Sequence, residues 1–234
     1  MNASRTARER VRAELIGEIK EAARRQLAVE GATGLSLRAV ARELGMVSSA
    51  IYRYFPSRDE LLTALIIEAF DAVGAAVEAA DAACPRDAYL DRWMAACRAI
   101  RSWALAHPHE YALIHGSPVP GYVAPRDTAA AAARDGIVMA AILSEAHKAG
   151  RLAPRPSELP PVPPSFAEDA AGLREALFFA LPDDLIMQAV MAWTSIYGVV
   201  SFELFGMYNN VITDTAAAFD HHALCQARLM GFGD

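Results

Sequence analysis

The sequence predicts an all-α fold in which a small N-terminal helical domain precedes a larger helical one. Apolar residues make up 54% of the 234 positions, with alanine prominent among them, and they recur at helical rather than alternating spacing. The thirteen prolines gather between these periodic segments, where they mark loops. The chain is long enough for two domains and a sizeable core.

Two short helices are predicted to follow a longer one at the N-terminus. The long helix covers residues 10–30, and "GATG" at 31–34 interrupts it. A second helix covers 37–44, where Ser36 is suited to capping its start and Gly45 to ending it. The apolar stripe of the first helix consists of Val11, Leu15, Ile19, Ala22, Ala23 and Leu27.

A third helix is predicted to begin near Ser48. Val47, Ile51 and Phe55 are spaced by four, which gives this short segment one inward face. The "SRDE" that follows at 57–60 matches a capping box, so a longer fourth helix begins there. We therefore expect a domain boundary at this point, with one domain at residues 1–57 and another at 58–234.

Charge is divided unevenly between these two parts. Residues 1–58 hold 11 of the 22 Lys and Arg residues but only 6 of the 28 Asp and Glu residues, although the whole chain carries a net charge of −6. A basic N-terminal domain on an acidic body predicts that one end of the molecule meets a polyanion.

Two short helices joined by a glycine-containing turn, and braced by a longer helix, form a helix-turn-helix unit. The second helix of such a unit lies in the major groove of DNA, where base edges are readable. The alternative is an ordinary packing unit with a solvated outer face. Arg5, Arg8, Arg10 and Arg12 are expected to form a flexible minor-groove arm. The candidate DNA-binding residues are Ser36, Arg38, Ser48, Ser49, Tyr52, Arg53, Tyr54 and Arg58.

Residues 31–65 resemble the N-terminal domain of the TetR family of bacterial transcription regulators. The shared features are a hydroxyl residue opening the second helix, Val-Ala-x-x-Leu-Gly, an aliphatic-Tyr-x-aromatic-Phe run, and a Pro-Ser-basic-acidic-Glu-Leu-Leu helix start. The resemblance covers about residues 10–65. It implies a symmetric, all-helical dimer in which each protomer reads one half-site. The family's DNA contacts correspond to Ser36, Arg38, Ser48, Ser49, Tyr52 and Arg58, whereas Arg53 and Tyr54 stand at variable positions.

The larger domain is predicted to contain several helices separated by proline-rich loops at 116–125 and 153–165. "AWTSIYGVVSFELFG", at 192–206, resembles a motif of one TetR subgroup. The family resemblance implies that this domain binds a small ligand and changes the spacing of the two DNA-binding domains. The predicted helices cover about 85–108, 126–149, 166–180, 183–206 and 214–230.

A stretch of eighteen residues without charge, 185–202, has nearly the length of a membrane span. The same pattern is typical of a helix buried between subunits. Since no second such stretch exists, we expect no membrane span. We expect instead a homodimer in which this helix and residues 214–230 pack against their copies as a four-helix arrangement.

The larger domain also supplies candidates for a ligand cavity, since such pockets combine apolar walls with a few polar groups. Ordinary core packing is the alternative for each of them. The candidates are Trp93, Met94, Cys97, Tyr111, His115, Tyr122, Met139, Trp193 and Tyr197.

No catalytic or cofactor motif is recognisable in the sequence. His107, His109, Glu110 and His115 do not have the His-Glu-x-x-His spacing of a zinc helix, so we expect no metal site. The N-terminus lacks the apolar core of a signal peptide and the three cysteines are widely spaced, which favours a cytoplasmic protein.

The leading hypothesis is a homodimeric regulator that binds a palindromic double-stranded DNA operator, more specifically a repressor released by an unknown small-molecule effector. The alternative is a cytoplasmic helical protein that binds or transforms a small molecule and whose N-terminal three-helix unit is only structural. The first hypothesis predicts salt-sensitive, sequence-specific DNA binding, which the second does not.

Overall fold

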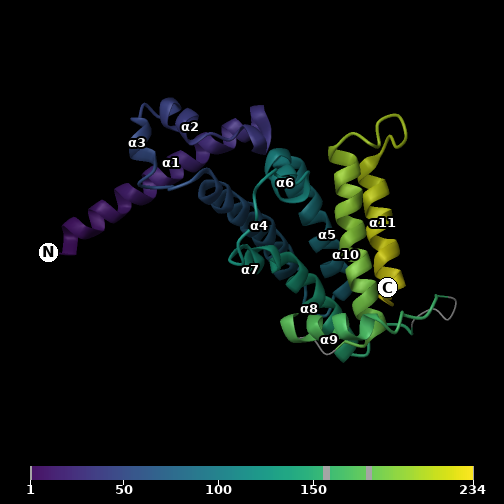
Figure 1. Ribbon diagram of the computed structural model, residues 1–234. Helices are drawn as coiled ribbons and strands as arrows, with labels where there is room; N and C mark the ends of the chain where they lie inside the picture. The colour runs from purple at the N-terminus through teal and green to yellow at the C-terminus, as the bar shows by residue number, and fades with distance from the viewer. Residues whose placement is uncertain (1, 155–158, 178–180, 234) are drawn as a thin grey trace. The chain divides into compact units, whose positions relative to one another are not determined.

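The computed structural model describes residues 2–154, 159–177 and 181–233, with the side chains of residues 2–6 left aside. Within these residues the regular structure is helical, and the β contact present is an isolated bridge between Leu152 and Phe232 (Figure 1). The all-α prediction is therefore confirmed. The chain forms two compact units, one of residues 1–70 and 107–131, the other of 71–106 and 132–234.

The first unit contains the three N-terminal helices, the beginning of α4 and the short helix α6. Its core gathers apolar side chains from all of them, including Ile19, Val40, Ile51 and Leu62, each fully buried. The helices of this unit are α1 (Asn2–Gly34), α2 (Leu37–Glu43), α3 (Ser48–Ile51), α4 (Arg58–Ala82, which continues into the second unit) and α6 (Pro108–His115).

Helix α1 is longer than the sequence predicted. It begins at Asn2, so the residues expected to form a flexible arm are helical, and it kinks at Gly31, whose φ of 67° lies in the left-handed region. The predicted break at 31–34 thus takes the form of this kink. Val11 was expected to lie in the apolar stripe, but it is exposed, because the buried part of the helix begins later.

Two predicted helix caps have different outcomes. The Glu60 backbone N–H donates to Ser57 Oγ over 3.1 Å, which confirms the serine half of the capping box at the start of α4. Ser36 is the N-cap residue of α2, but its side chain makes no capping hydrogen bond. Its own backbone N–H donates to Gln26 Oε1 of α1 over 3.2 Å. A contact between two helices therefore holds the start of α2.

The chain from 107 to 131 differs most from the prediction. Pro108 was expected to end a helix, but it is the first residue of α6, a position in which its missing N–H and fixed φ are favourable. The α6 helix packs on α1, and Tyr122 beyond it forms a 2.8 Å hydrogen bond between its hydroxyl and that of Thr63 on α4. This segment therefore belongs to the core of the first unit.

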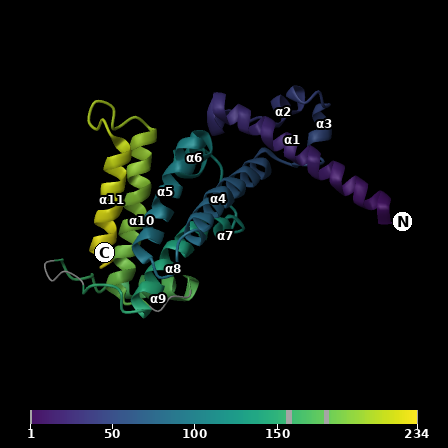
Figure 2. The same ribbon diagram turned by 180° about the vertical axis from the view of Figure 1, so that it is seen from behind.

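The second unit is a bundle built around α5. This helix packs against α8, α10 and α11, while α9 packs on α10. Helices α10 and α11 lie side by side along their length (Figures 1 and 2). The helices of this unit are α5 (Tyr89–Ala106), α8 (Arg134–Lys148), α9 (Phe166–Leu177), α10 (Asp183–Leu204) and α11 (Thr215–Leu229), with α7 (Thr128–Ala132) where the chain passes from the first unit to the second.

A buried arginine ties three helices of this unit together. Arg92 of α5 is fully buried, and its guanidinium pairs with Asp81 of α4 at 2.7 Å and with Glu145 of α8 at 2.6 Å. These hydrogen-bonded ion pairs outweigh the cost of burial and raise the pKa of Arg92 while lowering that of Asp81. Removing either carboxylate would leave a buried charge without its full set of partners.

Helix α10 has the length and hydropathy of a membrane span, as its uncharged sequence indicated. Only 33% of its most apolar window is buried within the unit, and several large apolar side chains of this helix face outward. The exposed ones are Val190, Met191, Trp193 and Phe202.

Candidate functional site

The turn between α2 and α3 depends on Gly45. Its φ is 66°, a conformation that side chains disfavour, and its N–H donates to the Arg42 carbonyl over 3.2 Å. The next N–H, of Met46, donates to the Ala41 carbonyl over 2.8 Å. These two bonds close the end of α2 and turn the chain directly into α3, as a helix-turn-helix unit requires.

Helix α3 is shorter than predicted and is followed by turns up to Tyr54. Ile51 is fully buried and Phe55 nearly so, and the Phe55 N–H donates to the Ile51 carbonyl over 3.0 Å. These two apolar side chains fix the segment to the unit. Val47 was expected to share their inward face, but it is 71% exposed, because it precedes the helix in extended conformation.

The opposite side of this segment presents polar side chains to solvent. Ser48, Ser49, Tyr52 and Arg53 are all exposed, and Arg38 of α2 is exposed as well. Hydroxyl and guanidinium groups at such a surface can donate to phosphates and base edges. Ser36, at the start of α2, is half-buried. We call the surface formed by Arg38, Ser48, Ser49, Tyr52 and Arg53 the polar face.

Tyr54 is held from the side by α1. Its ring is half-buried, and the Arg12 guanidinium lies 5.2 Å from the ring centroid. A second Arg12 contact, from Nη2 to the Arg53 carbonyl, measures 3.4 Å. Arg12 therefore links α1 to the end of the polar face, a role that its position in the sequence did not indicate.

Arg58 turns toward the protein backbone. Its Nη2 donates to the Ala32 carbonyl over 2.6 Å and its Nε to the Leu35 carbonyl over 3.1 Å. The Ala32 carbonyl lies in the last turn of α1 and the Leu35 carbonyl in the link to α2. Carbonyls at a helix end lack helical partners and can accept such bonds. The sequence predicts that Arg58 contacts the DNA backbone. In the structure its guanidinium braces the link between α1 and α2.

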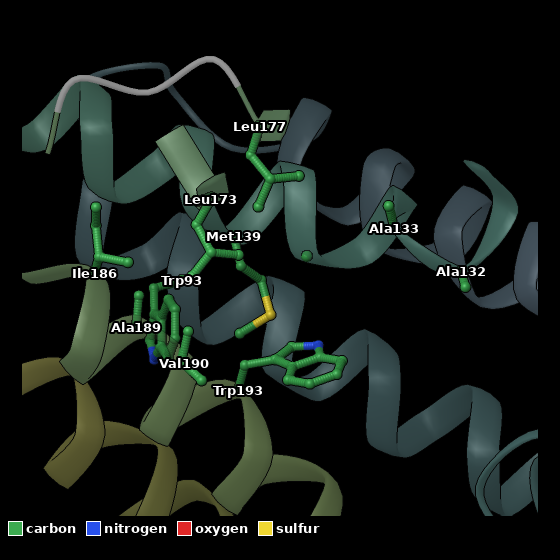
Figure 3. Close-up of a pocket in the computed structure, with 12 residues that line it drawn as sticks. Trp93, Ala132, Ala133, Met139, Leu173, Leu177, Ile186, Ala189, Val190 and Trp193 are labelled. Carbon is green, nitrogen blue, oxygen red and sulfur yellow. The ribbon is translucent and has the colours of Figure 1, made fainter. Parts of the chain in front are cut away.

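The second unit has a partly open cavity of about 340 Å³ between α8, α9 and α10 (Figure 3). Leu173 lies on one side of it and Trp193 on the other, with Met139 between them. The lining residues in the described part of the chain are all apolar: Trp93, Ala132, Ala133, Gly136, Met139, Ala140, Leu173, Leu177, Ile186, Ala189, Val190 and Trp193.

Three of the nine predicted cavity residues line this cavity, namely Trp93, Met139 and Trp193. Met94 and Cys97 are core residues of α5, and burial raises the pKa of the Cys97 thiol well above its usual range, which makes it unreactive. Three further predicted residues belong to the first unit and lie in α6 and the loop after it, namely Tyr111, His115 and Tyr122. The alanines, glycine and leucines of the wall could not be predicted, because such side chains are equally common in ordinary core packing.

A buried carboxylate lies beside the cavity. Asp135 of α8 is 3% exposed, and its Oδ2 accepts hydrogen bonds from Tyr197 Oη at 2.7 Å and from Trp193 Nε1 at 3.1 Å. Tyr197 therefore has a polar contact next to the cavity without lining it. The bond from Trp193 Nε1 fixes its ring, which forms part of the wall, to α8.

The histidine-rich segment at α6 has structural contacts. His107 is the N-cap residue of the helix, and Glu110 pairs with Arg24 of α1 at 3.2 Å. His115 packs edge-on against Phe70 of α4 and lies tilted against the Tyr111 ring. In the described part of the chain, no three metal-ligating side chains come together.

Comparison with known proteins agrees with this arrangement. Residues 19–65 match the family described as bacterial regulatory proteins, tetR family, and residues 93–225 match the tetracyclin repressor-like C-terminal domain. The HTH-type transcriptional regulators Rv1816 of Mycobacterium tuberculosis and Mb1846 of Mycobacterium bovis are each 38% identical to this chain over 234 residues. The match covers 97% of this chain and 93% of each relative.

Solved structures give the same result. The regulatory protein SCO4313 is 32% identical, with a TM-score of 0.75 over 93% of this chain and 97% of that one. A regulatory protein of the tetR family from Rhodococcus RHA1, 19% identical with a TM-score of 0.64, shares the fold over 94% of this chain and 98% of that one. The relatives are regulators and not enzymes, which sets aside the catalytic alternative. The chain belongs to the TetR family of DNA-binding transcriptional regulators.

Proposed function

We propose that this chain is a cytoplasmic repressor that binds a palindromic operator as a homodimer and is released from it by a small-molecule effector. The observation that carries the proposal is the polar face. Its side chains are exposed, while Ile51 and Phe55 of the same segment are buried and hold it rigidly. A rigid, exposed polar surface in the basic part of the chain suits the major groove of DNA.

Each side chain of the polar face has a proposed role. Arg38 and Arg53 reach guanine edges or phosphates, Tyr52 donates to a phosphate or packs on a thymine methyl, and the serine hydroxyls donate to phosphates. Ser36 lies at the start of α2, where backbone N–H groups favour an anion. Tyr54 and Arg58 flank this surface and hold its shape through their contacts with α1 and the link after it.

The proposed dimer forms through α10 and α11. Met191 and Phe202 on α10 are 62% and 52% exposed, and they lie three turns apart on one face. Leu229 of α11 is exposed as well. A soluble protein normally covers such a run of large apolar side chains. The proposed cover is the same face of a second copy, which a two-fold axis brings into register.

The cavity beside Trp193 is the proposed effector site. It lies between α8, α9 and α10 and so contacts the helix that carries the proposed dimer face. An effector that binds one arrangement of these helices more tightly would shift the protein toward it, and this coupling to DNA binding is reciprocal. The effector then releases the protein from DNA if it binds the operator-bound arrangement more weakly than the other.

Selection from random DNA duplexes tests the proposal. We expect an inverted repeat whose half-site centres lie about 10–10.5 base pairs apart or a multiple of that spacing. The double variant Arg38→Ala and Tyr52→Ala should lose affinity for the selected duplex by at least about 100-fold while remaining folded and dimeric. Arg151→Ala, which removes an exposed arginine of the second unit, is the matched control and should retain affinity. Selected sequences without a repeat, or a double variant that still binds, would contradict the proposal.

A further inference from the structure

We infer that the cavity between α8, α9 and α10 takes an uncharged, apolar molecule about the size of two fused rings. This inference rests on the proposed effector site and specifies what that site accepts. Four features of the second unit support it: the composition of the wall, the state of its two indole N–H groups, the position of Asp135 and the volume of the cavity.

The described residues of the wall offer a ligand almost no hydrogen bond. Its side chains are those of Ala, Leu, Ile, Val, Met and Trp, together with Gly136. The two Trp side chains carry the N–H donors, and both are already engaged. Trp93 Nε1 donates to the Ala223 carbonyl over 3.1 Å, and Trp193 Nε1 donates to Asp135 over 3.1 Å. A polar ligand group placed against this wall would lose its hydrogen bonds to water without replacement.

Asp135 does not convert the cavity into a cation site. Its carboxylate accepts from Trp193 of the wall, but Asp135 is not among the lining residues that the structure describes, whereas its neighbour Gly136 is. Oδ2 of Asp135 already accepts two hydrogen bonds, from Trp193 and Tyr197. Asp135 therefore holds the Trp193 ring in place, and the ring rather than the carboxylate lines the cavity.

The volume limits the size of the molecule. An apolar protein cavity of about 150 Å³ holds one benzene ring. The present cavity, at about 340 Å³, is a little more than twice that volume. The flat Trp93 and Trp193 rings favour a flat or compact apolar occupant, because aromatic rings gain from stacked and edge-on contacts.

Three probes that differ in charge test the inference. Naphthalene is uncharged, 2-naphthoate carries a negative charge, and naphthalen-2-ylmethylammonium carries a positive one. Equilibrium dialysis against the full chain measures the dissociation constant of each. We expect naphthalene to bind at least about tenfold more tightly than either ion, because a charge in an apolar cavity is strongly disfavoured. Equal or tighter binding of an ion, or no binding of naphthalene, would overturn the inference.

Gly136→Leu locates the bound probe. An added Cβ at Gly136 meets no atom within 4 Å, so the longer side chain can extend into the cavity without a clash at its base. This variant should remain folded and lose naphthalene binding by at least about tenfold. The matched control is Gly172→Leu on α9, an exposed helical glycine outside the lining that also has open space around its Cβ. It should bind naphthalene as the parent does, and binding that survives Gly136→Leu would place the probe elsewhere.

The two proposals fail separately. DNA selection without naphthalene tests the regulator, whereas dialysis without DNA tests the cavity. If the protein bound naphthalene selectively but bound DNA without sequence preference, the inferred ligand class would hold and the proposed operator would not. If the protein bound DNA sequence-specifically but preferred one of the charged probes, the proposed operator would hold and the inferred ligand class would not.

Discussion

Arg58 shows how a side chain can have a structural role that its sequence position does not reveal. The sequence marks it as a basic residue at the start of a helix, next to the polar face. In the structure its guanidinium donates to the Ala32, Thr33 and Leu35 carbonyls and so closes the link between α1 and α2. A long-range contact of this kind depends on the folded chain, and no local pattern predicts it.

We expect Arg58→Ala to lower the free energy of unfolding by about 1.5–3 kcal/mol, since hydrogen bonds from a charged donor are lost. Operator affinity should fall with it, because the start of α2 loses its brace. The salt dependence of that affinity should stay unchanged. Urea unfolding and a salt titration of operator binding measure the two effects.

Arg58→Lys is the matched variant, and it should recover only part of the stability, since an ammonium group cannot reach the same carbonyls in the planar geometry of a guanidinium. If Arg58→Ala left stability intact and reduced the salt slope by about one phosphate contact, Arg58 would be a DNA clamp instead.

At the scale of the element, the sequence predicts best what is decided locally. Ser57 caps α4 through the Glu60 N–H, three residues away, and Gly45 takes the left-handed conformation that ends α2. Both depend on residues within one helical turn. Pro108 is ambiguous, because proline follows helix ends and also opens helices. Only the packing of α6 on α1 decides between these possibilities.

The candidate sites follow the same division. The polar face could be predicted in part, because helical spacing places Ile51 and Phe55 inward and Ser49 outward. The same spacing placed Val47 inward, where the structure exposes it. The cavity could be predicted only in part. Its aromatic residues have a chemical signal, whereas Ala189 and Gly136 line it by virtue of the space that they leave empty.

Gly45 allows a test of the turn as an element. Gly45→Ala should cost about 1–2 kcal/mol of unfolding free energy, because its φ of 66° disfavours a side chain. The cost should come from the backbone alone, since no atom lies within 4 Å of the added Cβ. Urea unfolding measures the change.

Gly17→Ala is the control for this prediction. Gly17 lies in the interior of α1, and its Cβ also meets open space. The substitution should stabilise the protein by about 0.5–1 kcal/mol, because alanine loses less freedom than glycine in a helix. If both substitutions stabilised the protein, the turn would not require the left-handed conformation.

At the scale of the whole molecule, basic residues and exposed apolar residues are concentrated in different segments, and each kind favours a different partner. The basic residues of the N-terminal segment favour a polyanion, while acidic residues predominate in the rest of the chain. The exposed apolar side chains of α10 favour burial against another protein surface. The proposed dimer face and the polar face belong to different units and share no residue.

A charged variant of the α10 face tests this assembly. Met191→Glu with Phe202→Glu should produce a folded monomer, because both side chains are exposed in the single chain and a two-fold interface would bring four new carboxylates together. Sedimentation velocity measures the mass. Operator affinity should fall roughly 10²–10⁴-fold, since each monomer then binds one half-site without the second. The control, Val29→Glu with Val123→Glu, changes two exposed valines of the first unit in the same way and should remain dimeric. A dimer that survives the α10 substitutions would have to use a different surface, and the spacing of the two half-sites would then depend on that surface.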